Sequence, residues 1–297
     1  MPVGFIGLGN MGSNMANHLL NKGHRLVVYD VYPEAMTAFA DKGALVAQNP
    51  AELANKCDRV FTMLPTGSHV LEAYNGKNGI LEKVKPGTLL IDSSTIDPST
   101  SREVAKLAEA KGAVFLDAPV SGAVPAARAA TLTFMVGGKE KEVQAIKDLL
   151  LCMGKNVVHC GDVGSGEIAK ICNNMALAIT MIGTSEALNL AKQSGLDPKL
   201  MTKILNIGSG RSWSSEVYNP VPGVMENVPA ANNYDGGFMV QLMTKDLGLA
   251  QASATRTNTP TPLGTLSHQI YRLMQNNGYA SKAVSYTHLT LPTILRV

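Results

Sequence analysis

The sequence lacks the features that mark several classes of protein. No apolar run reaches the ~18 residues of a membrane span, and no block of Lys and Arg is dense enough to indicate nucleic-acid binding, the formal net charge being only +3. The four cysteines have no C-x-x-C spacing, and the six histidines have no metal-ligand spacing. We therefore expect no membrane, no nucleic acid and no metal ion as a partner, and we expect unpaired thiols.

The composition is that of a globular protein with room for two domains. Apolar residues make up 45% of the 297 residues and charged residues 16%, so the chain can bury a substantial core. No signal or transit peptide precedes the first predicted strand, which begins at Val3. This predicts a cytoplasmic protein, or a mitochondrial one if a presequence has been removed.

The N-terminus carries the most informative motif. Residues 3–6 are predicted as a strand and residues 13–22 as a helix, with G-x-G-x-x-G between them. In this context the first glycine permits the tight turn, the second lets the backbone approach a pyrophosphate, and the third lets helix and strand pack closely. The free N–H groups and the positive dipole end of the helix N-terminus favour binding of the phosphates. The predicted dinucleotide-binding residues of this turn are Gly7, Leu8, Gly9, Asn10, Met11 and Gly12.

Asp30 follows the second predicted strand, residues 25–29, about 20 residues after the glycines. An acid at this point hydrogen-bonds the adenosine ribose hydroxyls and repels a 2′-phosphate, and no Arg or Lys lies between Asp30 and Asp41. The pattern favours NAD over NADP. The alternative is that Asp30 only begins the turn before Pro33.

The two halves of the chain have different patterns. Strands alternate with helices through the first 160 residues or so, which predicts a doubly wound parallel sheet of the Rossmann type. After Gly166 only helices are predicted, beginning with a long one over residues 167–194. The predicted fold class is α/β, with a dinucleotide-binding domain over residues 1–162 and an all-α C-terminal domain over residues 163–282, joined at a glycine-rich hinge.

Polar groups follow three predicted strands at the edge where this architecture binds ligands. They are Leu64-Pro65-Thr66, the segment 92–95, and the segment from Asp117 to Ser121-Gly122. A hydroxyl and successive backbone N–H groups at Ser121-Gly122 suit a carboxylate. Each segment is also compatible with an ordinary turn.

Lys170 and Asn174 lie four residues apart on the long predicted helix and therefore share a face. Lys170 carries the only charge between Glu167 and Glu186, which favours a helix buried on most sides. A partly desolvated lysine has a lowered pKa and transfers protons near neutral pH. Lys245, beside Asp246, is a further candidate, and the alternative for this pair is a solvated helical surface.

Four segments together resemble the β-hydroxyacid dehydrogenases. They are the glycine turn with its helix, the Asp117 to Gly122 segment, the helix from Gly166 to Asn174, and Lys245-Asp246-Leu247, and the resemblance runs from residue 3 to about 282. Within that family, residues 91–98 and 218–225 resemble the branch that oxidises 3-hydroxyisobutyrate with NAD to methylmalonate semialdehyde in valine breakdown. Members of the family are usually homodimers or homotetramers.

The resemblance implies a role for each matching residue. Lys170 would be the catalytic acid/base and Asn174 its partner, while Ser121, Gly122 and Ala123 would bind the substrate carboxylate. The remaining cofactor-binding residues would be Leu64, Pro65 and Thr95 on the nicotinamide side, and Lys245 over the cofactor and substrate.

Two features depart from the family. Ala123 stands where the family usually has a second glycine, which puts the size of the substrate loop in question. Residues 283–297 are β-branched, contain Pro292 and lack helical periodicity, so we hypothesise a non-native tail. The alternative functions are another β-hydroxyacid dehydrogenase, such as tartronate semialdehyde reductase or a 6-phosphogluconate-dehydrogenase-like protein, and a non-catalytic dinucleotide-binding module.

Overall fold

The computed structural model describes residues 1–288 and divides into two compact units. The first unit is Met1–Lys170, and the second begins at Ile171. The sequence placed this boundary between residues 162 and 163, whereas the first turn of the long helix α9 (Ser165–Gln193) belongs to the first unit. The physical reason is that this turn is hydrogen-bonded to the end of a strand in that unit, at Asp117.

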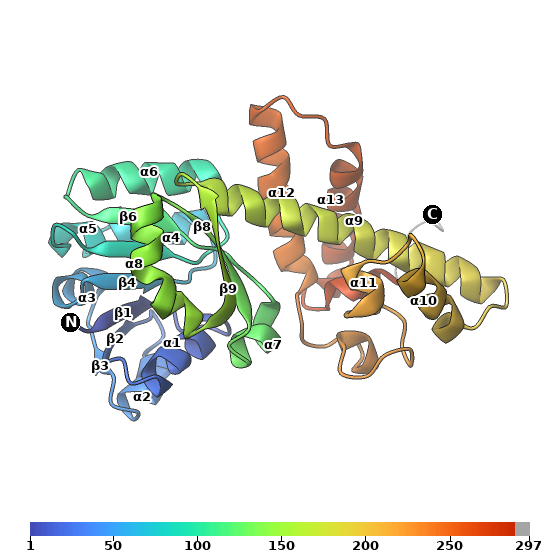
Figure 1. Cartoon of the computed structure of the whole chain (residues 1–297), viewed down its shortest axis with the longest axis horizontal. Helices are drawn as coiled ribbons and strands as arrows, with labels where there is room; N and C mark the ends of the chain where they lie inside the picture. Colours follow the sequence, from blue (N-terminus) through green and yellow to red (C-terminus); the bar gives the residue numbers. More distant parts are fainter. Residues whose placement is uncertain (289–297) are drawn as a thin grey trace. The chain divides into compact units, whose positions relative to one another are not determined.

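The first unit is built on one mixed sheet of order β3-β2-β1-β4-β5-β6-β8-β7, with β9 beside β8 (Figure 1). Its strands are β1 Val3–Ile6, β2 Leu26–Tyr29, β3 Leu45–Val46, β4 Arg59–Thr62, β5 Leu89–Asp92, β6 Val114–Asp117, β7 Val120–Ser121, β8 Leu132–Gly137 and β9 Gly154–Gly161. The pairs from β3 through to β6 are parallel, and β8 runs antiparallel to β6 and β7. The carboxyl ends of β1, β4, β5 and β6 therefore meet at one edge.

Helices cover both faces of this sheet, and each face has its own core. The helices are α1 Gly12–Asn21, α2 Pro33–Ala40, α3 Pro50–Lys56, α4 Gly67–Asn75, α5 Ile80–Lys83, α6 Pro98–Glu109, α7 Ala123–Arg128 and α8 Glu140–Leu151. Successive strand residues alternate between the cores: Phe5 packs with Met15 of α1, whereas Ile6 packs with Leu53 of α3. Because side chains alternate along a strand, a strand covered on both faces is apolar throughout.

The second unit is helical in the part of the chain that the structure describes. It contains the remainder of α9, then α10 Pro198–Ile207, α11 Trp213–Glu216, α12 Val240–Arg256 and α13 Pro262–Met274. Its core gathers apolar side chains from α9, α12 and α13. No helix within residues 1–288 is long and apolar enough to cross a membrane.

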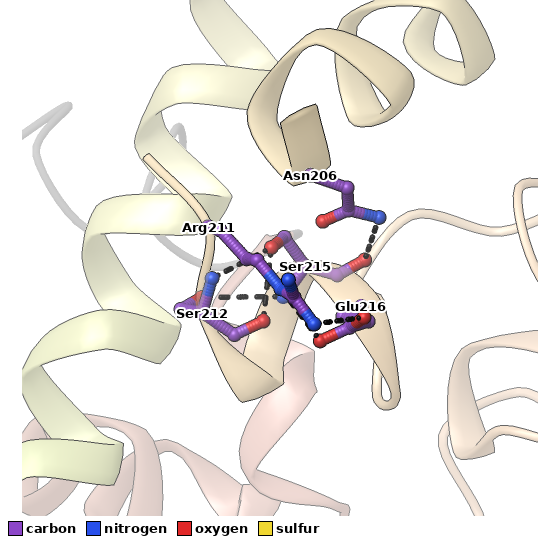
Figure 2. A network of polar contacts seen from close by, with 5 residues as sticks. All are labelled: Asn206, Arg211, Ser212, Ser215 and Glu216. Atoms are coloured by element: carbon purple, nitrogen blue, oxygen red, sulfur yellow. Dashed lines mark hydrogen bonds and ion pairs between the residues drawn. The ribbon is translucent and has the colours of Figure 1, made fainter. Parts of the chain in front are cut away.

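A polar network fixes the connection between α10 and α11 (Figure 2). Ser212 and Ser215 form a reciprocal capping box at the start of α11. The Arg211 guanidinium donates two hydrogen bonds to the Glu216 carboxylate, at 3.0 and 2.7 Å. The side chain of Asn206 donates to the Ser215 carbonyl oxygen at 3.4 Å. The capping box and the Asn206 contact satisfy backbone groups at the two ends of α11.

The predicted fold class is confirmed, both in the Rossmann-type sheet and in the helical second unit. The segment predicted as a non-native tail is described only as far as His288, and residues 289–297 lie outside the described residues. Its first residues contribute to the second unit: the Val284 N–H donates to the Phe238 carbonyl oxygen at 2.8 Å, and the side chain of Val284 is buried. Whether the segment is native stays a prediction.

Candidate active site

The glycine turn has the geometry that its three glycines predict. Gly7 has φ +93°, in the left-handed region, and its N–H donates to the Tyr29 carbonyl oxygen at 3.0 Å. A Cβ on Gly12 would clash with the carbonyl oxygen of Gly7, so the close packing of β1 and α1 requires glycine there. Apart from the residues next to it in the chain, no atom of residues 1–288 lies within 4 Å of the place that a Cβ on Gly9 would take. The backbone at Gly9 is therefore open to a ligand at the N-terminus of α1, as a pyrophosphate requires.

Asp30 is tied to that turn. Its Oδ2 accepts a hydrogen bond from the Leu8 N–H at 2.6 Å, and its Oδ1 accepts one from the Tyr32 N–H at 2.9 Å. The bond to Tyr32 is the contact expected if Asp30 only begins the turn before Pro33. The bond to Leu8, however, places the same carboxylate beside the glycine turn. A carboxylate has about four acceptor positions, so both contacts leave acceptors for ribose hydroxyls. These residues fit a dinucleotide.

A chain of hydrogen bonds positions the loop after β4, which carries Leu64 and Pro65. The Leu64 N–H donates to the Ser94 hydroxyl at 2.8 Å, and that hydroxyl donates to Asp92 Oδ1 at 2.6 Å. The Thr62 hydroxyl donates to the same oxygen at 2.7 Å. Leu64, one of the predicted nicotinamide-side residues, is therefore held by a buried network whose centre is Asp92. The sequence predicted a strand end at Asp92 but indicated no role for its carboxyl group.

Burial raises the pKa of the Asp92 carboxyl to about 6. The hydrogen bonds from Ser94 and Thr62 lower this pKa in part, and the nearby carboxyl of Asp117 raises it further. Asp92 and Asp117 are register partners at the ends of β5 and β6. Burial also raises the pKa of Asp117, opposed by backbone N–H groups of Gly164 and Glu167. Two buried carboxyl groups thus lie side by side at the edge of the sheet where the predicted site residues gather.

The predicted substrate loop turns sharply. Ser121 ends β7, Gly122 has φ +130°, and Ala123 has φ +55° at the start of α7. Two consecutive residues with positive φ favour glycine at both positions, and the second of them here is alanine. Ala123, which stands where the family usually has glycine, therefore occupies a strained backbone position.

Lys170 and Asn174 are both buried on α9, with 7% and 2% of their surfaces exposed. The Asn174 side-chain amide donates to Asp246 Oδ2 at 2.6 Å, and Lys245 Nζ lies 3.3 Å from Asp246 Oδ1. The buried carboxylate of Asp246 thus joins Asn174 to Lys245, two residues that the sequence analysis selected separately. The sequence marked Lys245-Asp246 as a candidate pair but indicated no separate role for Asp246, which the structure places between Lys245 and Asn174.

Comparisons with known proteins identify the family. The family described as the NAD binding domain of 6-phosphogluconate dehydrogenase matches residues 2–161, and that described as "NAD-binding of NADP-dependent 3-hydroxyisobutyrate dehydrogenase" matches residues 164–287. The mitochondrial 3-hydroxyisobutyrate dehydrogenase of Mus musculus is 63% identical over 284 residues, which cover 96% of this chain and 85% of that protein. The human protein of the same name is also 63% identical and is covered to 84%.

The chain belongs to the 3-hydroxyisobutyrate dehydrogenase family. A solved structure of the 3-hydroxyisobutyrate dehydrogenase of Mycobacterium tuberculosis with L-serine matches it with a TM-score of 0.93 and 40% identity, covering 98% of each chain. The predicted membership of the β-hydroxyacid dehydrogenases is confirmed, as are the class of NAD-dependent oxidoreductase and the nicotinamide dinucleotide cofactor.

The family match extends to residue 287, so it includes the first residues of the segment predicted as a tail. The roles assigned to single residues stay predictions. Within residues 1–288, no group of three or more His, Cys, Asp and Glu side chains is arranged to hold a metal ion.

Proposed function

We propose that this chain oxidises 3-hydroxyisobutyrate to methylmalonate semialdehyde with NAD. The observation that carries the proposal is the buried lysine on α9, Lys170, one helical turn before the buried Asn174, in a chain that also carries the dinucleotide turn. Relatives with this activity in their name are 63% identical over 96% of the chain and support it. The L-serine in the mycobacterial structure supports a substrate of the same size and class, because serine is also a 3-hydroxy acid.

The dinucleotide is held by residues 7–12, Asp30, Leu64, Pro65 and Thr95. A dinucleotide held there would supply the acceptor for the hydride of the carbon that bears the hydroxyl. The first turn of α1 offers its free N–H groups to the phosphates. The Ser94 hydroxyl fixes the Leu64 backbone, which keeps the loop after β4 in place when the cofactor binds. Lys245, held by Asp246, is a further cofactor-binding residue in this proposal.

Lys170 moves the proton. Its uncharged amine accepts the proton of the substrate hydroxyl, and the charged amine returns it in the reverse reaction. The orientation of the Asn174 side chain is fixed at both ends, because its amide donates to Asp246 and its carbonyl oxygen accepts from the Asn173 amide at 3.1 Å. Ser121, Gly122 and Ala123 bind the substrate carboxylate through a hydroxyl and backbone N–H groups.

NAD is the preferred dinucleotide in this proposal, although the description of the second matching family names NADP. The Asp30 carboxylate, fixed by the Leu8 N–H, would repel a 2′-phosphate. Titration of the protein with each dinucleotide tests this. Asp30→Ser should weaken NAD binding and reduce the difference in affinity between NAD and NADP. A wild-type protein that binds NADP more tightly than NAD would contradict the assignment.

The activity is tested by following absorbance with NAD and 3-hydroxyisobutyrate, in parallel with L-serine, 6-phosphogluconate and, in the reductive direction, tartronate semialdehyde. Lys170→Ala should lose nearly all turnover and retain NAD binding. Lys192→Ala, at the exposed end of the same helix, is the matched control and should keep wild-type turnover. Preference for another compound, or turnover that survives Lys170→Ala, would refute the substrate or the role of the lysine.

We also propose a homodimer or homotetramer in the mitochondrion. On α13, Leu263, Leu266 and Leu273 are exposed apolar side chains at helical spacing, which supports burial against another copy. The relatives at 63% identity are named as mitochondrial, which supports the location that the sequence left as an alternative. Light scattering of wild type and Leu266→Glu tests the assembly, and imaging of the native protein tests the location.

A further inference from the structure

The carboxylate of Asp117, fully buried at the end of β6, is fixed to the first turn of α9. Its Oδ1 accepts a hydrogen bond from the Gly164 N–H at 2.7 Å, and its Oδ2 accepts one from the Glu167 N–H at 2.9 Å. The first N–H groups of a helix have no partner within the helix, and a negative charge there balances the positive end of the helix dipole. Asp117 therefore acts as a cap that a distant strand supplies to α9.

Two glycines make room for this carboxylate. A Cβ on Gly137, the register partner of Asp117 in β8, would clash with Asp117 Oδ1. A Cβ on Gly166 would lie 2.9 Å from Asp117 Oδ2 and would clash with the Met135 carbonyl oxygen. Strand and helix thus approach as closely as backbone atoms permit. The first turn of α9 has little freedom to shift or rotate while the carboxylate is in place.

A second contact ties the same turn to the site. The buried Glu167 accepts a hydrogen bond at Oε2 from the Ile96 N–H at 3.2 Å, directly after Thr95. Lys170 follows Glu167 by three residues and therefore lies on the same side of α9, one turn along. A shift of the first turn of α9 would therefore displace Lys170 as well, because consecutive turns of a helix move together.

We propose that Asp117 is a positioning residue for the reaction: it locks the first turn of α9 to the end of β6 and so fixes the Lys170 amine for proton transfer. This inference rests on the proposed role of Lys170. Asp117 also begins the segment that leads to Ser121, in the loop proposed to bind the substrate.

Asp117→Asn tests the proposal. Asparagine has the same shape, but its amide nitrogen donates and so cannot accept from a second N–H, and one of the two bonds is lost. We expect kcat for 3-hydroxyisobutyrate, expressed per NAD-binding site measured by calorimetry, to fall about 10- to 100-fold, as misplacement of a catalytic group by a fraction of an ångström to 1 Å does. The KM should stay within about threefold, because the residues that bind the substrate are retained. In a Lys170→Ala background, Asp117→Asn should lower the residual rate no further.

Asp197→Asn is the matched control, because Asp197 caps α10 by accepting from two backbone N–H groups, and α10 carries no proposed catalytic group. It should leave kcat and KM unchanged. If Asp117→Asn does not fold, Asp117→Ser replaces it, since serine removes both bonds without placing an NH2 group against the backbone N–H groups. The inference would be overturned by a kcat per site within twofold of wild type. It would also be overturned if only KM changed, or if neither variant bound NAD. A wild-type chain without turnover would instead refute the proposed function.

Discussion

The buried carboxyl of Asp92 makes the stability of the first unit depend on pH. Burial raises its pKa from 3.8 to about 6. Because the folded pKa lies above the unfolded one, the stabilising contribution is complete below pH ~4 and is lost as the pH rises through 6. A tenfold change in an acid constant corresponds to ~1.4 kcal/mol, so the cost of ionising Asp92 in the folded protein is on the order of 3 kcal/mol.

Asp92→Asn removes this dependence while keeping the network. The asparagine carbonyl can accept the bonds that Thr62 and Ser94 donate to Oδ1. Asp92 Oδ2 has no partner among the described residues, so the new NH2 group is left unpaired at a cost of about 1–3 kcal/mol that does not vary with pH. Asp92→Asn should therefore be less stable than wild type at pH 4.5 and should regain about 2 kcal/mol relative to wild type by pH 7.5.

Urea unfolding at a series of pH values measures this difference. The signal should be far-ultraviolet circular dichroism, because Trp213, the only tryptophan, lies in the second unit. Asp41→Asn, at an exposed carboxylate after α2, is the control and should follow the wild-type curve. The free energy of unfolding of Asp92→Asn should still decrease somewhat as the pH rises, because burial also raises the pKa of Asp117. Parallel curves for wild type and Asp92→Asn between pH 4.5 and 7.5 would refute the reasoning.

Three further predictions concern single positions. Ala123→Gly should raise the free energy of unfolding by about 0.5–1 kcal/mol, because Ala123 has φ +55°, whereas Ala129→Gly, at φ −85°, should not; thermal melts compare the two. Gly9→Ala should melt like wild type and bind NAD more weakly, whereas Gly12→Ala should lower the melting temperature, because only the second Cβ meets the backbone. At pH 8 the thiol reagent DTNB should label the exposed Cys172 at once and Cys57 only after unfolding, because burial raises the pKa of the Cys57 thiol to about 12; early labelling of Cys57 would contradict its burial.

The sequence alone determined the elements whose signals are local. The predicted strand 3–6 has the observed bounds of β1, and the predicted strand 25–29 begins one residue before β2, because each is a short apolar run that ends at a turn residue or an acid. The glycine turn was equally predictable, since Gly7 has a positive φ and a Cβ on Gly12 would clash with the Gly7 carbonyl oxygen five residues earlier. The family followed from motifs of the same local kind.

Short strands and the supports of the site needed the tertiary structure. β3 and β7 contain two residues each and exist only because β2 and β8 supply their hydrogen-bond partners. The bonds from Asp117 to α9 and from Asp246 to Asn174 join residues that are far apart in the sequence. No periodicity or composition encodes such pairs, because their energy depends on burial and on distances of about 3 Å that exist only after the chain has folded. The sequence determined which residues could take part in the chemistry, and the tertiary structure decided which carboxylates hold them in place.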